Sequence, residues 1–161
     1  MWYHVQMELP SGQMHDCFLR PDFKVEKNFT AEELANTKAQ EDFQLILYRD
    51  SLRFLDMIQV FRDWYSHPMH VNSCYRTPSF NKECGGSPNS EHLRSCALDW
   101  GKSGLTDAQR EKYTAKWKEI CEKYNNGRGQ INYYTNGIHF GLGMHYTQFT
   151  VLDYRGKSGD W

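Results

Sequence analysis

Residues 73–100 read SCYRTPSFNKECGGSPNSEHLRSCALDW, and this stretch decides both the fold and the candidate site. Its first four residues are the end of the segment 69–76, in which the alternation of residue types predicts a strand. Its middle is rich in turn-forming residues and predicts a loop with one helical turn. Residues 95–100 predict the next strand, so residues 90–94 are expected to be the loop that leads into it.

Helix signals flank this stretch on both sides. Thr30 and Glu33 have the spacing of a capping box, which predicts a short helix. Apolar residues recur every three or four positions over residues 42–66, which predicts a long amphipathic helix. Thr106 and Gln109 predict the cap of a second long helix. The expected buried stripe of that helix comprises Tyr113, Trp117, Ile120 and Tyr124.

Three short strands are predicted after this second helix, at residues 129–134, 137–142 and 149–155. The order of strands and helices predicts an α+β fold, with helices packed on one face of a small, largely antiparallel sheet. A length of 161 residues fits one domain, and we expect it to span residues 1–161.

Composition narrows the classes of function. Hydrophobic residues make up 39% of the chain and aromatic residues 15%, which is typical of a packed globular protein. The formal net charge of −1 and the lack of a long Lys or Arg run argue against a nucleic-acid partner. No run approaches the roughly 18 apolar residues of a membrane span. We therefore expect neither nucleic acid nor membrane as a partner, and we expect a monomer.

The cysteines and the first residues predict a location. Five cysteines without a CxxC pair fit reduced thiols better than a disulfide framework, although a Cys74–Cys84 bridge is an alternative. The N-terminal residues do not have the pattern of a signal peptide. We therefore expect a cytoplasmic protein.

His92 and Asp99 suggest metal chemistry. A catalytic zinc ion commonly takes three protein ligands, imidazoles with or without a carboxylate, and keeps a fourth position for water. His92, Asp99 and a later His would supply such a set if the loop at residues 90–94 and the strand at residues 95–100 converge. A hydrogen-bonded structural pair is the alternative interpretation of two such residues alone.

The wider stretch resembles the first signature of the M15 zinc peptidases. That signature has a YRT-P segment, an Asn, a GG turn and then S-x-H-x(6)-D. The matching residues here are Tyr75, Arg76, Thr77, Pro78, Asn81, Gly85, Gly86, Ser90, His92 and Asp99. The family comprises D,D-carboxypeptidases, D,D-dipeptidases and L-alanyl-D-glutamate endopeptidases that cut bacterial wall peptides, and many are phage lysis enzymes. The resemblance implies a hedgehog/D,D-peptidase-like fold with Zn²⁺ held on the sheet by His92 and Asp99.

The resemblance also implies a third zinc ligand near the C-terminus. The segment GQINYYTNGIHF, residues 129–140, has the form of the family's last motif and makes His139 that ligand. His145 is the competing candidate, but it lies beside a predicted turn. A second alignment places residues 149–156 on the family's terminal run, and Val151 then occupies the ligand position.

The sequence departs from the family where a catalytic base is expected. Family members commonly have an acid three residues before the last His or two residues after it. Those positions are Asn136 and Gly141 here. A general base must come within hydrogen-bond reach of the attacking water, and the candidates are Asp153, Glu91 and His145.

Two further residues are candidates for substrate binding. The guanidinium of Arg76 can hold a carboxylate of the wall peptide by two parallel hydrogen bonds, and the family places this Arg beside the zinc. Ser90 is expected to orient substrate or the adjacent ligand, with a turn or capping role as the alternative.

Together these residues predict a zinc-dependent peptidase that acts on peptidoglycan stem peptides. The resemblance favours a phage-type lysis enzyme, which would accumulate in the host cytoplasm before release to the wall. A bacterial enzyme that trims wall-derived peptides is compatible with the same composition. The alternative from another class is an impaired M15-like domain that binds wall peptide or a protein partner without turnover.

Overall fold

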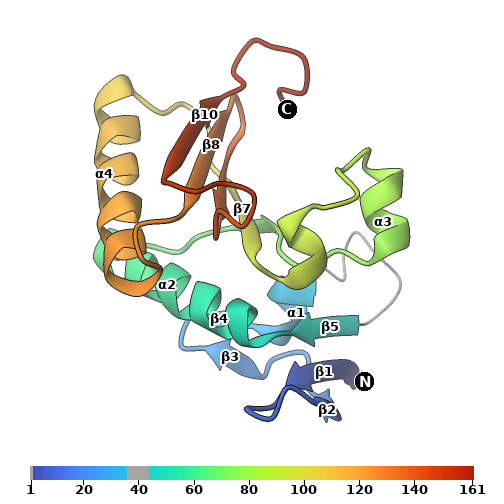
Figure 1. The fold of residues 1–161 in the computed structure, drawn as a ribbon. Helices are drawn as coiled ribbons and strands as arrows, with labels where there is room; N and C mark the ends of the chain where they lie inside the picture. Colours follow the sequence, from blue (N-terminus) through green and yellow to red (C-terminus); the bar gives the residue numbers. More distant parts are fainter. Residues whose placement is uncertain (1, 36–43) are drawn as a thin grey trace.

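A five-stranded sheet is the centre of the α+β fold in the computed structural model, which describes residues 2–35 and 44–161 (Figure 1). The strand order is β10-β8-β9-β7-β6, and neighbours are antiparallel except for β10, which runs parallel to β8. The strands are β6 (Val71–Ser73), β7 (Ala97–Gly101), β8 (Gln130–Tyr134), β9 (Gly137–Gly141) and β10 (Thr150–Asp153). The strands predicted after residue 129 are therefore confirmed.

Two long helices, α2 (Arg49–Tyr65) and α4 (Asp107–Tyr124), cover one face of this sheet. Phe61 of α2 and Trp117 of α4 both contact the ring of Phe140 on β9, with centroid separations of 4.9 and 5.1 Å. This confirms the predicted packing of helices on one face. None of the helices among the described residues is long and apolar enough to span a membrane.

Two smaller sheets accompany the central one, whereas the sequence predicted one sheet. The first has the order β2-β1-β5 and consists of β1 (Tyr3–Glu8), β2 (Met14–Leu19) and β5 (Gln44–Leu47). The second pairs β3 (Lys24–Glu26) with β4 (Phe29–Thr30). The parallel pairing of β1 with β5 joins segments about 40 residues apart, and local patterns do not reveal such a contact.

The short helices lie where local signals placed them. Helix α1 (Ala31–Ala35) begins at the predicted capping box, in which Thr30 N donates to Glu33 Oε2 at 2.9 Å. Thr106 N donates to Gln109 Oε1 at 2.8 Å at the start of α4. Helix α3 (Pro78–Glu83) is the predicted helical turn, and the 3₁₀ helix η1 (Glu91–Arg94) forms in the predicted loop.

The helix predicted over residues 42–66 is too long at its N-terminal end. Residues 44–47 form β5, and residues 42 and 43 lie outside the described part of the chain. Leu45 and Leu47 are buried on one face of β5, which pairs with β1 in the N-terminal sheet, and their spacing to the apolar residues of α2 imitates a helical period. Ser51 Oγ accepts from Tyr48 N at 2.8 Å and sets the true start of the helix.

The predicted stripe of α4 is wrong at its last position. Tyr113, Trp117 and Ile120 are buried, but Tyr124 is 38% exposed and Cys121 is buried in its place. The small Cys121 fits because the returning chain passes close to it at Gly129, where an added Cβ would lie 2.2 Å from Cys121 Sγ.

A pH-dependent contact joins β3 to α2. Burial, followed by the hydrogen bond to Asp56 and the charge of Asp56, raises the pKa of Glu26 to about 8. The folded state therefore holds a proton that the unfolded state releases near its ordinary pKa of 4.5. This contribution to stability is complete below the unfolded pKa and is lost as the pH rises towards 8.

We expect Glu26→Gln to flatten this dependence, because the amide keeps a hydrogen-bond donor without titrating. The measurement is Tm at pH 5 and pH 8.5, with Glu32→Gln, at an exposed acid of α1, as the control. The wild-type protein and the control should lose more Tm between the two pH values than Glu26→Gln. Equal losses in all three proteins would contradict the assignment.

Candidate metal centre

A His–Asp–His cluster lies on the face of the central sheet opposite α2 and α4. His92 comes from η1, Asp99 from β7 and His139 from β9, and their potential ligand atoms all lie within 4.8 Å of one another. His92 Nε2 is 3.2 Å from Asp99 Oδ2, and His139 Nδ1 is 2.7 Å from Asp99 Oδ1. The structure thus brings together the three residues predicted as metal ligands.

Strand register and a tight turn place these side chains. Asp99 lies directly opposite His139 in the β7–β9 pair, while their neighbours Leu98 and Phe140 point to the helical face. Ser90 Oγ accepts from His92 N at 3.2 Å and starts η1. Ser95, with a φ of 54°, ends it and returns the chain to β7. The seven residues from His92 to Asp99 therefore span one turn of η1, the chain reversal at Ser95 and the first half of β7.

The electrostatics of the cluster favour metal-binding protonation states. Burial alone would raise the pKa of Asp99, but the charge of His92 and hydrogen bonds from both imidazoles hold it well below its usual range. Burial lowers the pKa of His92, against the attraction of Asp99. Metal ligation requires an ionised carboxylate and a neutral imidazole, so both pKa shifts favour the forms that bind a cation.

Arg76 lies beside the cluster, as the sequence resemblance implied. Its Nη2 donates to Asp99 Oδ2 at 3.2 Å and its Nε to Ser73 Oγ at 3.1 Å. Its Nη1 is 3.5 Å from Asn81 Oδ1, and 17% of the side chain is exposed. Through these contacts Arg76 holds the Asp99 carboxylate in place. A substrate carboxylate could reach the exposed part of the Arg76 side chain.

A pocket of about 170 Å³ opens beside His139. It is lined by Ser87, Asn89, Ser90, Glu91, Gln130, Asn132, His139 and His145. Two of the three predicted base candidates, Glu91 and His145, thus share a pocket with a residue of the cluster. Ser90 lines it as well, in addition to capping η1.

The two base candidates in the pocket differ in their surroundings. Glu91 is 5% exposed, and burial raises its pKa against the charge of His139. His145 is exposed, and its Nε2 donates to the carbonyl oxygen of Asn89 at 2.6 Å. Because a carbonyl can only accept, the proton of a neutral His145 is on Nε2, and Nδ1 is left as an acceptor.

Asp153 is not brought to the cluster. In the β10–β8 pair it lies beside Tyr133, whose ring is buried on the helical side of the sheet. Its carboxylate forms an ion pair with Arg155 at 2.7 Å. Val151 on the same strand is 47% exposed and also lies away from the cluster. Of the three candidate bases, Asp153 is therefore the one that the structure places away from the cluster, and the structure supports the alignment that uses His139.

Sequence reasoning missed two buried amides beside the cluster. Asn132 lies opposite His139 in the β8–β9 pair, and its Oδ1 accepts from Gln130 Nε2 at 3.0 Å. Both residues are less than 10% exposed. The alternation of Gln130 and Asn132 with Ile131 and Tyr133 was the available signal, because it gives this strand a polar face on the side of His139.

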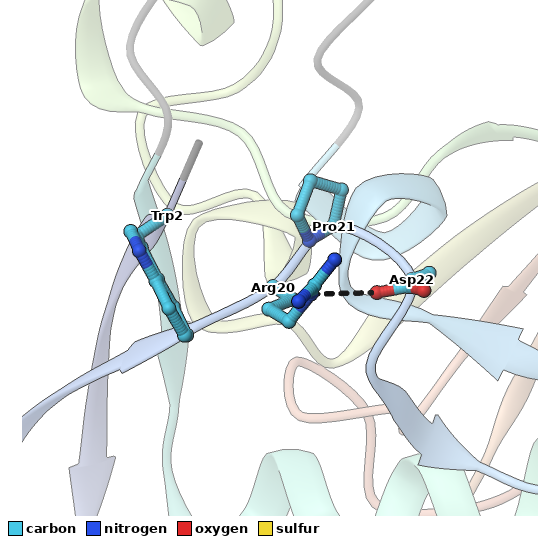
Figure 2. A pocket seen from close by; sticks show the side chains of 4 residues that line it. All are labelled: Trp2, Arg20, Pro21 and Asp22. Atoms are coloured by element: carbon cyan, nitrogen blue, oxygen red, sulfur yellow. Dashed lines mark ion pairs between the residues drawn. The ribbon is translucent and has the colours of Figure 1, made fainter.

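Another pocket, of about 310 Å³, lies beside the N-terminal sheet (Figure 2). Its described lining consists of Trp2, Arg20, Pro21 and Asp22, with the Trp2 indole standing across from the Arg20–Asp22 ion pair. None of the predicted site residues lines it. The candidate centre therefore remains the pocket at His139.

Comparison with known proteins agrees with the geometry. Residues 27–140 match the family model described as Peptidase M15. This range contains the whole cluster and Arg76, and leaves β1, β2, β3 and β10 outside. A search of curated proteins returned no match.

If the cluster binds a metal ion, Zn²⁺ should stabilise the fold. At a free concentration 100 times the Kd, binding contributes about 2.7 kcal/mol, which corresponds to a rise in Tm of about 5–10 °C for a chain of this size. We expect this rise in the wild-type protein and in His70→Ala, at an exposed His outside the cluster, but not in His139→Ala. An equal rise in His139→Ala, measured by differential scanning fluorimetry, would place the metal elsewhere.

Proposed function

The chain belongs to the peptidase M15 family, and on this premise we propose that it is a zinc-dependent peptidase that hydrolyses the peptide part of bacterial peptidoglycan. Family membership suggests a hydrolase of peptidoglycan-type substrates. The observation that carries the finer proposal is the convergence of His92, Asp99 and His139 beside a pocket.

The donor set fits zinc. Two imidazole nitrogens and one carboxylate oxygen are a common set in catalytic zinc sites, which keep the remaining position for water or substrate. His92 Nε2, Asp99 and His139 Nδ1 would hold the ion. When bound, zinc lowers the pKa of water to about 7 and polarises the scissile carbonyl.

The surrounding residues take defined roles in this proposal. Arg76 holds Asp99 and offers its exposed edge to a carboxylate of the stem peptide. His145 accepts the proton of the attacking water at Nδ1, because Nε2 is already bound to Asn89 and the ring lines the pocket. Asn132 and Gln130 supply amide groups on the opposite wall, where a peptide backbone can form hydrogen bonds.

A biological setting follows from the sequence resemblance alone. We place the enzyme among the phage-type lysis peptidases, acting as a monomer on the wall after release from the host cytoplasm. The bond that is cut depends on which part of the stem peptide Arg76 holds.

A second candidate is a domain that binds wall peptide without turnover. It is favoured by Asn136 and Gly141, which stand where family members commonly have acids. It predicts binding that depends on Arg76, with no new peptide ends.

The deciding experiment is mass spectrometry of purified peptidoglycan of several chemotypes after incubation with zinc-loaded protein. The proposal expects new peptide ends with the wild-type protein and none with His92→Ala. Intact wall in every sample, with zinc confirmed as bound, would contradict hydrolysis of these substrates and favour the binding domain.

The role of His145 has a separate test. We expect His145→Asn to lower kcat by about 10²- to 10⁴-fold, the usual contribution of a general base, while the protein retains zinc. Steady-state hydrolysis of a soluble stem peptide measures the effect, with His67→Asn, at an exposed His outside the pocket, as the control. A kcat within a few-fold of the wild-type value would remove His145 from the mechanism.

A further inference from the structure

We propose that Trp161 forms an aromatic platform beside the candidate metal centre, on which a sugar ring of the peptidoglycan strand stacks. This proposal rests on the proposed function and adds the glycan to the parts of the substrate that the protein recognises. Trp161 determines which substrates bind well, and the cluster carries out hydrolysis.

The indole of Trp161 lies on the same face of the central sheet as His139. Its Cζ3 atom is 2.6 Å from the position that a Cβ on Gly137 would take, so the ring fills the space of a missing side chain. Gly137 is two residues before His139 on β9, and alternate residues of a strand point to the same face. Two residues of a strand span about 7 Å. The indole therefore lies next to the row of the sheet in which His139 pairs with Asp99.

The pocket at His139 extends in the opposite direction along the sheet. Its lining includes Gln130, which pairs with Gly141, two residues beyond His139 on β9. The cluster therefore lies between this pocket and the Trp161 indole. A substrate bound across the cluster has one side of its scissile bond in the pocket and the other side towards the indole.

Two tyrosine rings stack with Trp161. The ring of Tyr134 lies 4.8 Å from the indole between centroids, with an interplanar angle of 27°. The ring of Tyr154 stacks on Tyr134 at 5.2 Å and 12°. The indole is still 40% exposed. A ring that is held by such a stack before a ligand arrives loses little freedom on binding, which favours affinity.

The segment that carries Trp161 is fastened to the hairpin of β8 and β9. Asn136 N donates to a main-chain oxygen of Trp161 at 2.9 Å. The Asp160 carboxylate accepts from Thr135 N at 2.6 Å, from Gly156 N at 2.7 Å and from the Thr135 hydroxyl. Figure 1 shows this segment after β10, on the side of the sheet away from α4. Bonds outside the indole thus hold it in place and leave its ring for a ligand.

The chemistry of this surface favours a sugar ring over a charged group. The carboxylate of Asp160, beside Trp161, is already engaged by its three donors. The face of an indole carries partial negative charge, to which the C–H groups of a pyranose ring are attracted. The carboxylates of the stem peptide have a cationic partner in Arg76 instead. Because each stem peptide is attached to a sugar ring, one substrate can engage both groups.

The test compares two soluble substrates, a disaccharide that carries its stem peptide and the same stem peptide without sugar. We expect Trp161→Ala to lower the ratio of kcat/KM for the first substrate to kcat/KM for the second by about tenfold, which corresponds to about 1.4 kcal/mol. The change should lie in KM, because a contact away from the reacting atoms stabilises the ground state and the transition state alike.

Three further variants separate stacking from packing. Trp161→Phe should keep most of the wild-type ratio, because phenylalanine presents an aromatic face. Trp161→Leu should behave like Trp161→Ala, because leucine keeps apolar volume but has no ring. Trp2→Ala removes a tryptophan that is 61% exposed and lies in the N-terminal part of the chain, so the ratio should stay at the wild-type value.

The outcomes separate the platform from the proposed function. An unchanged ratio in Trp161→Ala, or equal losses on both substrates, would overturn the platform. Lack of hydrolysis of both substrates by the zinc-loaded wild-type protein would overturn the peptidase instead. Isothermal titration calorimetry with the sugar-bearing substrate then decides on the platform. Weaker binding by Trp161→Ala than by the wild-type protein would support it, and equal binding, or no binding by the wild-type protein, would overturn it. If Trp161→Ala does not fold, Trp161→Leu replaces it in both measurements.

Discussion

The candidate centre depends on the buried carboxylate of Asp99 and on the register that sets it opposite His139. Asp99 contacts His92, His139 and Arg76, and it is 5% exposed. A carboxylate in such a place is costly unless positive charge or hydrogen-bond donors surround it. Arg76 supplies a permanent positive charge at Oδ2, which His92 Nε2 also approaches, while His139 Nδ1 lies at Oδ1.

The hydrophobic core protects this register. Phe140 follows His139 in sequence and packs against Phe61 and Trp117. One face of β9 therefore carries a core residue and the other face carries a residue of the cluster. A slip of one residue in the β7–β9 pairing would move Phe140 to the site and His139 to the core. The aromatic packing of α2 and α4 therefore maintains the geometry of the cluster from the other side of the sheet.

Local sequence signals predicted individual helices and strands better than they predicted how distant strands pair. Capping at Thr30 and Thr106 depends on residues three apart, and the sequence contains all that such a cap needs. The strand β5 was read as helix because its identity depends on pairing with β1, about 40 residues away. The N-terminal hairpin of β1 and β2 was not predicted at all.

The same distinction applies to the site. His92, Asp99 and His139 could be found because family resemblance fixes their order and spacing, and the structure brings them together. Asp153 could not be excluded from sequence, because only the parallel pairing of β10 with β8 reveals which face it occupies. The proximity of Glu91 to Gly141 depends on how η1 crosses the end of β9, and no periodicity encodes that contact.

The most direct measurement of the central claim is the anomalous diffraction of a zinc-loaded crystal at the zinc absorption edge. We expect one strong peak bound by His92 Nε2, an Asp99 carboxylate oxygen and His139 Nδ1, at about 2.0–2.2 Å from each. A zinc ion held by other side chains would contradict the proposed site, if His92, Asp99 and His139 still contacted only one another and Arg76.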